Sequence, residues 1–175
     1  MYKNFKKNSG FSLMELIVVL GMISIISAFS LPSFKKWLPN YRLKAAVRDF
    51  YSNMQKARME AVKTNQNVLI EFFVGVYTPG GRVGSYRVFV DKSAPSGAYD
   101  GGDDILVQTN MPKNVSLYFN NFTGNTTGYT SQSLPWSNNW GSVEFRNSNS
   151  RYYQASLSAA GIVNIKTGND GASWN

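Results

Sequence analysis

The chain has 175 residues, enough for one folded domain beside an N-terminal apolar segment. It contains no cysteine and no histidine, which excludes a disulfide-stapled fold, Ser-His-Asp and Cys-His catalysis, and the commonest zinc ligand. The net charge of +8 comes from the first 63 residues, because residues 64–175 carry seven basic and seven acidic side chains. The charge alone therefore does not mark the C-terminal part as a nucleic-acid-binding domain.

The N-terminal region has the pattern of a membrane span with a basic flank. Lys3, Lys6 and Lys7 precede the 21-residue segment Phe11–Leu31, whose residues are apolar or small apart from Glu15. As a helix this segment would be about 32 Å long, enough to cross a hydrocarbon core of about 30 Å. We expect a transmembrane helix with the basic flank on the cytoplasmic side and the rest of the chain outside.

Glu15 is an unusual residue for a simple anchor. A carboxylate within a span costs about 2.5–3.5 kcal/mol at the centre and less near the edge, so it usually has a partner. If the chain were cut between Gly10 and Phe11, the new positive amine would lie one helical turn before Glu15. The amine of one subunit could then pair with Glu15 of the next, so the same segment would specify both cleavage and assembly.

The segment Lys7–Leu16, KNSGFSLMEL, resembles the prepilin leader junction of type IV pilins and type II secretion pseudopilins. The resemblance implies that a prepilin peptidase cuts the Gly10–Phe11 bond and methylates Phe11. It also implies that Glu15 is the carboxylate used in assembly and that Pro32 kinks the helix.

Two other interpretations of this segment remain open. A basic region followed by an apolar run also describes a secretory signal peptide, but such a peptide has its small-residue cleavage site after the apolar run, and Gly10 precedes it. A plain membrane anchor would keep its leader uncut.

The helix is expected to continue beyond the span to about Thr64. Apolar residues recur there at spacings of 4, 3, 4, 3 and 4, which is the period of a helix with one buried stripe: Leu43, Val47, Phe50, Met54, Ala57 and Ala61. We expect this stripe to pack on a sheet. Basic residues lie largely off the stripe, either as a solvated face or as contacts for anionic lipid headgroups.

From Gln66 onward the pattern changes to short strands separated by the turns Gly80-Gly81, Gly101-Gly102 and Ala160-Gly161. The predicted strands are Val68–Val74, Tyr86–Val90, Ile105–Gln108, Val115–Phe119, Ser142–Arg146, Tyr153–Leu157 and Ile162–Ile165. One long helix followed by strands predicts an α+β fold in which the helix packs on an antiparallel sheet.

The later chain resembles the GspH/FimT-like branch of pseudopilins and minor pilins. The resemblance lies in the helix end Ala57–Asn65, in Val88–Asp91 and the Asp/Gly loop up to Leu106, and in Ala159–Val163. Some minor pilins of this branch take up DNA through a Gly-Arg-rich C-terminal segment. Here the chain after Gly161 carries a single basic residue, Lys166, so DNA binding by that route is not expected.

Two loops are candidate binding sites. Asp91, Asp100, Asp103 and Asp104 share a Gly-rich loop that could hold calcium or could be an ordinary solvated turn. The second loop, Asn120–Gly141, is rich in Asn, Ser, Thr and Gly and contains four aromatic residues, Phe122, Tyr129, Trp136 and Trp140. These aromatics could contact a protein partner, an attachment surface or single-stranded nucleic acid, or they could cap the core.

The sequence thus predicts a structural subunit, and no catalytic, cofactor-binding or metal-binding residues are expected. We expect a leader at 1–10, a membrane and assembly helix at 11–31, an amphipathic stalk helix at 32–65 and a periplasmic β-rich domain at 66–175. The hypothesis is a minor pilin or pseudopilin of the bacterial inner membrane, assembled into a pilus or pseudopilus. Its expected partners are prepilin peptidase, other pilins, the inner-membrane assembly platform and membrane lipid. The alternative is a DNA-uptake minor pilin at a pilus tip.

Overall fold

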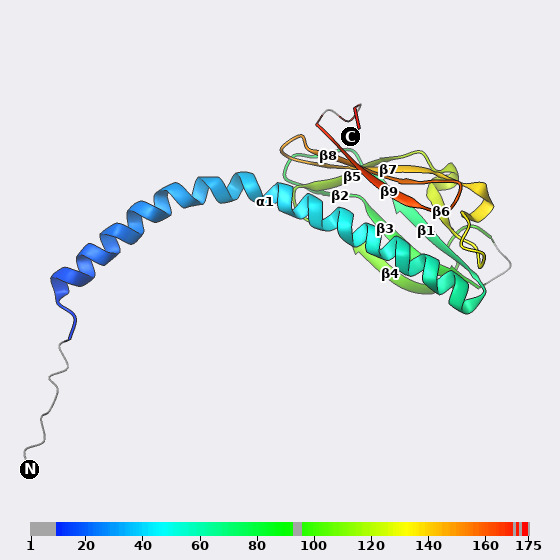
Figure 1. The fold of residues 1–175 in the computed structure, drawn as a ribbon, viewed down its shortest axis with the longest axis horizontal. Helices are drawn as coiled ribbons and strands as arrows, with labels where there is room; N and C mark the ends of the chain where they lie inside the picture. Colours follow the sequence, from blue (N-terminus) through cyan, green and yellow to red (C-terminus); the bar gives the residue numbers. More distant parts are fainter. Residues whose placement is uncertain (1–9, 93–95, 170, 172, 175) are drawn as a thin grey trace, which may run out of the picture. The chain divides into compact units, whose positions relative to one another are not determined.

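A computed structural model describes residues 10–92, 96–169, 171 and 173–174. The leader expected at residues 1–10 lies outside the described residues except for Gly10. The chain divides into two compact units, Met1–Trp37 and Leu38–Asn175, which are considered separately. Helix α1, Leu13–Thr64, contributes to both. The α+β fold class expected from the sequence is confirmed (Figure 1).

The first unit consists, in its described part, of residues 10–12 and the N-terminal portion of α1. The stretch Leu13–Ser30 has a mean hydropathy of 2.2 and none of its residues is buried. By length and composition it is a helix able to cross a membrane. Residue 32 belongs to α1, and the kink expected at Pro32 stays a prediction.

Among its described residues, the second unit contains nine strands in two sheets, and its C-terminal portion of α1 ends at Thr64. Asn65 adopts a left-handed φ of 54°, and the Gln66 amide donates to the Ala61 carbonyl at 3.3 Å, which stops the helix. The strands are β1 Asn67–Phe73, β2 Arg82–Val83, β3 Ser85–Asp91, β4 Asp104–Asn110, β5 Val115–Asn120, β6 Thr126–Tyr129, β7 Gly141–Asn147, β8 Tyr152–Leu157 and β9 Val163–Gly168.

The predicted antiparallel sheet domain is present, and its strands are divided between two sheets. One has the order β4-β3-β1-β6 and the other β2-β5-β7-β8-β9, and every neighbouring pair is antiparallel except the short pair β2/β5. A turn separates β4 from β5: the Val115 amide donates to the Pro112 carbonyl, and Asn114 has φ 69°. Alternation along one strand cannot reveal which strand is its neighbour, so the sequence pattern could not distinguish one sheet from two.

One hydrophobic core joins the helix to both sheets. All six residues of the predicted stripe are buried, as expected. The Phe50 ring lies 5.9 Å from Phe72 of β1, 5.2 Å from Tyr86 of β3 and 5.4 Å from Phe145 of β7, measured between ring centroids. In Figure 1 the C-terminal portion of α1 accordingly runs alongside the strands of this unit. Burying such aromatic side chains supplies much of the stability of a domain without disulfides.

The outer face of the first sheet has a smaller apolar cluster. Leu69 and Phe89 are cross-strand partners and both are fully buried, although they lie outside the main core. The Tyr99 ring packs edge-on against Phe89, with 5.6 Å between centroids. Tyr99 belongs to the loop between β3 and β4, which therefore covers this apolar cluster. The cover explains why β1 carries apolar residues on both faces.

Candidate functional site

The N-terminal junction expected to be cleaved is exposed. Gly10 and Phe11 precede α1, the Phe11 side chain is 86% exposed, and no described atom outside Gly10 and its chain neighbours lies within 4 Å of the place where a Cβ would stand at Gly10. The sequence suggested a helix from Phe11 onward, but the helix begins two residues later, at Leu13. The reason is that Ser12 caps it, since its Oγ accepts from the Met14 amide at 3.3 Å and its carbonyl from the Leu16 amide at 3.1 Å.

Glu15 lies in the first turn of α1, three residues after the Ser12 cap. A carboxylate at this position interacts favourably with the positive end of the helix dipole. Glu15 is exposed and is the single acidic residue among the described residues of the first unit. The structure thus brings Gly10, Phe11 and Glu15 together within one short exposed segment at the start of the helix.

The Asp-rich loop is organised by its own backbone. Asp103 accepts hydrogen bonds from the amides of Lys92 and Asp100, each at 3.0 Å, and Asp100 accepts from the Gly102 amide at 2.9 Å. Residues 93–95 of the loop lie outside the described part. Within the part that is described, no three acidic side chains converge on a position that could hold a metal. The calcium alternative therefore has no support there.

Among the described residues of the second unit, burial raises the pKa of four groups. Burial raises the pKa of Asp91, although the Gly97 and Ser96 amides act in the opposite sense. Burial also raises the pKa of Tyr86 and raises that of Tyr129 to about 12. The pKa of Tyr118 is raised by burial and by Glu144, whose Oε2 accepts from the Tyr118 hydroxyl at 2.6 Å. All four shifts favour the neutral form, as burial predicts.

A network of side-chain amides around the buried Asn147 ties the helix to the β7–β8 turn within the second unit. The Asn40 Oδ1 accepts from Asn147 Nδ2 at 2.8 Å and from Asn149 Nδ2 at 3.2 Å. The Asn147 Oδ1 in turn accepts from the backbone amides of Asn149 and Arg151, both at 3.0 Å. The Asn147 side chain is fully buried. This network could not be predicted from the sequence, because Asn40 and Asn147 are 107 positions apart and follow no motif.

The loop Asn120–Gly141 is not structureless. It contains β6, which pairs with β1, and two short 3₁₀ turns, η1 at Thr123–Asn125 and η2 at Trp136–Asn138. Phe122 and Tyr129 belong to the core, as the core-capping interpretation required. Trp140 is 62% exposed and Trp136 is half-buried, so the aromatic residues of this loop have two different roles.

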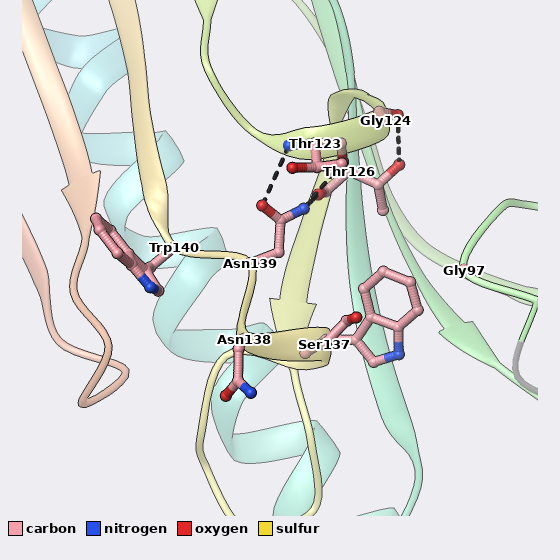
Figure 2. Close-up of a pocket in the computed structure, with 9 residues that line it drawn as sticks. Gly97, Thr123, Gly124, Thr126, Ser137, Asn138, Asn139 and Trp140 are labelled. Atoms are coloured by element: carbon pink, nitrogen blue, oxygen red, sulfur yellow. Dashed lines mark hydrogen bonds between the residues drawn. The ribbon is translucent and has the colours of Figure 1, made fainter.

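The two 3₁₀ turns border a concavity of about 550 Å³, lined by Gly97, Thr123, Gly124, Thr126 and residues 136–140. Asn139 fixes its wall: its amide donates to the carbonyls of Thr123 and Thr126 at 2.9 and 2.6 Å, and its oxygen accepts from the Thr123 amide at 3.1 Å. Figure 2 shows Asn139 between the turn and Trp140, with Gly97 on the opposite side. A Cβ at Gly97 would collide with the Trp136 indole, so glycine there lets this ring pack.

Comparison with known proteins agrees with this architecture. A family model described as "Type II transport protein GspH" matches residues 46–161, and one described as "Prokaryotic N-terminal methylation motif" matches residues 5–31. The pilin-like protein PilA1 of Thermus thermophilus is 33% identical over 96 residues, which are 54% of this chain and 55% of that protein. The chain thus spans about half the length of this curated relative.

No solved structure matches the chain. The methylation-motif match contains the exposed junction and Glu15, and the GspH match extends from the buried stripe of α1 to the turn before β9. Because the GspH match covers more than half of the chain, the protein belongs to the GspH family of type II transport proteins. It also carries a prokaryotic N-terminal methylation motif.

Proposed function

We propose that the protein is a minor pilin or pseudopilin, a structural subunit rather than an enzyme. In this proposal prepilin peptidase cuts the Gly10–Phe11 bond and methylates Phe11, and the mature subunit waits in the bacterial inner membrane with its C-terminal domain in the periplasm. An assembly platform then extracts it into a filament or tip complex with other pilins. The methylation-motif match over residues 5–31 and the family match over 46–161 support this function.

The observation that carries the proposal is the isolated acid at the start of an apolar helix. Glu15 stands in the first turn of the membrane-length stretch Leu13–Ser30, in which no residue is buried. An unpaired carboxylate is costly in apolar surroundings. In the assembled filament a neighbouring subunit must therefore supply a positively charged partner for Glu15. The amine created at Phe11 of a neighbouring copy has the required positive charge. Phe11 is only four residues from Glu15 in the sequence, so both belong to the N-terminal end of the apolar segment.

The direct test is the mass of the mature N-terminus. Protein purified from the inner membrane should begin at an N-methylated Phe11. A chain that still begins at Met1, or one that has lost the whole apolar stretch, would contradict the proposal.

The role of Glu15 is tested by Glu15→Ala, with Glu60→Ala on the same helix as the matched control. Glu60 pairs with Lys63 at 3.2 Å on the surface and should be dispensable. We expect the Glu15 variant to be membrane-bound and processed but to yield few sheared filaments, whereas the Glu60 variant should assemble normally. Wild-type assembly of the Glu15 variant would refute the assembly role.

DNA uptake is the second candidate, because exposed cations lie on the C-terminal portion of α1. Lys44, Arg48 and Lys56 are exposed there, with Asp49 among them. A gel shift with the full chain in zwitterionic nanodiscs, across a salt series, tests this. Uptake would require binding near physiological salt that weakens steeply as salt rises.

A further inference from the structure

The concavity between η1 and η2, here called the Trp140 cleft, is not used by the proposed assembly. Its lining residues are Gly97, Thr123, Gly124, Thr126 and residues 136–140, and its volume of about 550 Å³ falls in the range of small-molecule sites. None of these lining residues is charged. A divalent cation would need oxygen ligands from carboxylates, and a nucleic acid would need cations for its phosphates, so the lining favours neither.

The cleft combines an aromatic surface with small polar groups. The Trp140 indole is 62% exposed, which leaves a large flat apolar surface in water at the rim. The Thr123 and Ser137 side chains are also exposed and supply hydroxyl groups that can donate and accept. In Figure 2 the Ser137 side chain points toward the turn that carries Thr123, while the Asn138 amide points away from it.

The wall of the cleft is fixed before any ligand arrives. Three hydrogen bonds from the Asn139 side chain hold the turn at Thr123–Thr126, and the Thr127 hydroxyl donates to the Asn139 carbonyl at 2.7 Å. Ser137 and Asn138 both have a left-handed φ of 53°, a conformation that costs about 1–2 kcal/mol for a residue such as serine and that asparagine adopts more readily. A rigid site loses less entropy on binding than a mobile one.

From this chemistry we propose that the Trp140 cleft binds a neutral saccharide. A pyranose ring has an apolar face of C–H groups that stacks on an indole and an edge of hydroxyls that exchange hydrogen bonds with threonine, serine and amide groups. It carries no charge, which matches a lining of neutral residues. An apolar peptide would match the indole alone and would leave the hydroxyls of the cleft without partners.

The test uses the full chain in zwitterionic lipid nanodiscs, since sugar-headed detergents would compete. Cello-, chito- and malto-oligosaccharides are titrated separately by calorimetry and by ligand-observed NMR. At least one should bind with a Kd between about 0.1 and 10 mM. Its affinity should change less than twofold when salt is raised to about 0.5 M, because no charge is involved.

Trp140→Ala should weaken binding of that saccharide at least tenfold, and Thr123→Val should weaken it by a smaller factor. Phe119→Ala is the matched control, because Phe119 is a 44% exposed aromatic residue that does not line the cleft. The Trp140 and Phe119 variants should both assemble like the wild type, which separates this proposal from the assembly role of Glu15. The proposal is overturned if no probe binds at about 10 mM, if Trp140→Ala binds normally, or if only oligothymidine or an apolar peptide binds.

Discussion

Residues 13–30 and residues 43–61 belong to the same helix but use their apolar side chains in opposite ways. In the first stretch apolar residues occur on every side and none is buried. In the second, six apolar residues form one stripe and are all buried, while the other faces carry Lys44, Arg48 and Lys56. A helix that is apolar all round needs lipid or other helices around it, whereas a striped helix needs one packed face.

The comparison also separates two kinds of stability. The second unit has a core that links α1 to two sheets and an amide network around the buried Asn147, so its residues depend on each other. The described residues of the first unit have no core partner of this kind. Substitutions should therefore affect folding in the second unit, and insertion or assembly in the first. Four comparisons test this division, ordered by the expected effect on folding of the first substitution in each, from the largest to the smallest.

Phe50→Ala should have the largest effect, lowering the free energy of unfolding of the second unit by about 3–5 kcal/mol. The ring contacts Phe72, Tyr86 and Phe145, so its loss leaves a cavity between helix and sheets. Denaturant unfolding of the full chain in nanodiscs, followed by circular dichroism, measures the loss. The adjacent Tyr51→Ala, at a 39% exposed side chain, should change little. Equal effects of the two would mean that the stripe is not the core.

Asn147→Ala should lower the same free energy by about 2 kcal/mol, because the side chain is fully buried and the three groups bonded to it, at Asn40, Asn149 and Arg151, lose their partner. Asn40→Ala should cost about half as much, since Asn147 keeps its bonds to the amides of Asn149 and Arg151. The double variant should lose less free energy of unfolding than the sum of the losses in the two single variants. A double-mutant cycle measures the difference. Strict additivity would show that the Asn40–Asn147 bond contributes nothing.

Tyr129→Phe should stabilise the second unit by about 1 kcal/mol at neutral pH, because the buried Tyr129 hydroxyl makes no hydrogen bond to a described residue. Burial raises its pKa from 10.0 to about 12, so between these values the unfolded chain ionises first and the stability falls as pH rises. The variant should lose stability less steeply in that window. Urea unfolding at several alkaline pH values measures both effects, with the exposed Tyr51→Phe as control.

Ile23→Ala should have the smallest effect, changing the free energy of unfolding of the second unit by less than about 0.5 kcal/mol. Its side chain is 53% exposed in a stretch without buried residues. The same substitution at Ile70, 1% exposed in β1, should cost about 2–5 kcal/mol. Membrane insertion of the Ile23 variant should weaken only slightly. A comparable loss of domain stability at both sites would end the distinction between the two units.

Part of this protein could be read from the sequence because the signals are local and periodic. The stripe from Leu43 to Ala61 follows a 3.6-residue period, the strands from Val68 onward follow short apolar runs, and the junction at Gly10–Phe11 is a contiguous motif. Each of these depends on residues within about two helical turns or one strand. The helix end near Thr64 was likewise expected, and the structure places the left-handed Asn65 directly after it.

Only the tertiary structure decided the rest, because it depends on contacts between distant residues. Four features depend on segments that share no sequence pattern: the division into two sheets, the pairing of β6 with β1, the Asn40–Asn147 bond and the Trp140 cleft. The four aromatic residues of the loop 120–141 look alike in sequence, yet two are buried in the core and Trp140 faces water. Their roles differ because burial is set by the neighbours that folding supplies and not by the residue itself.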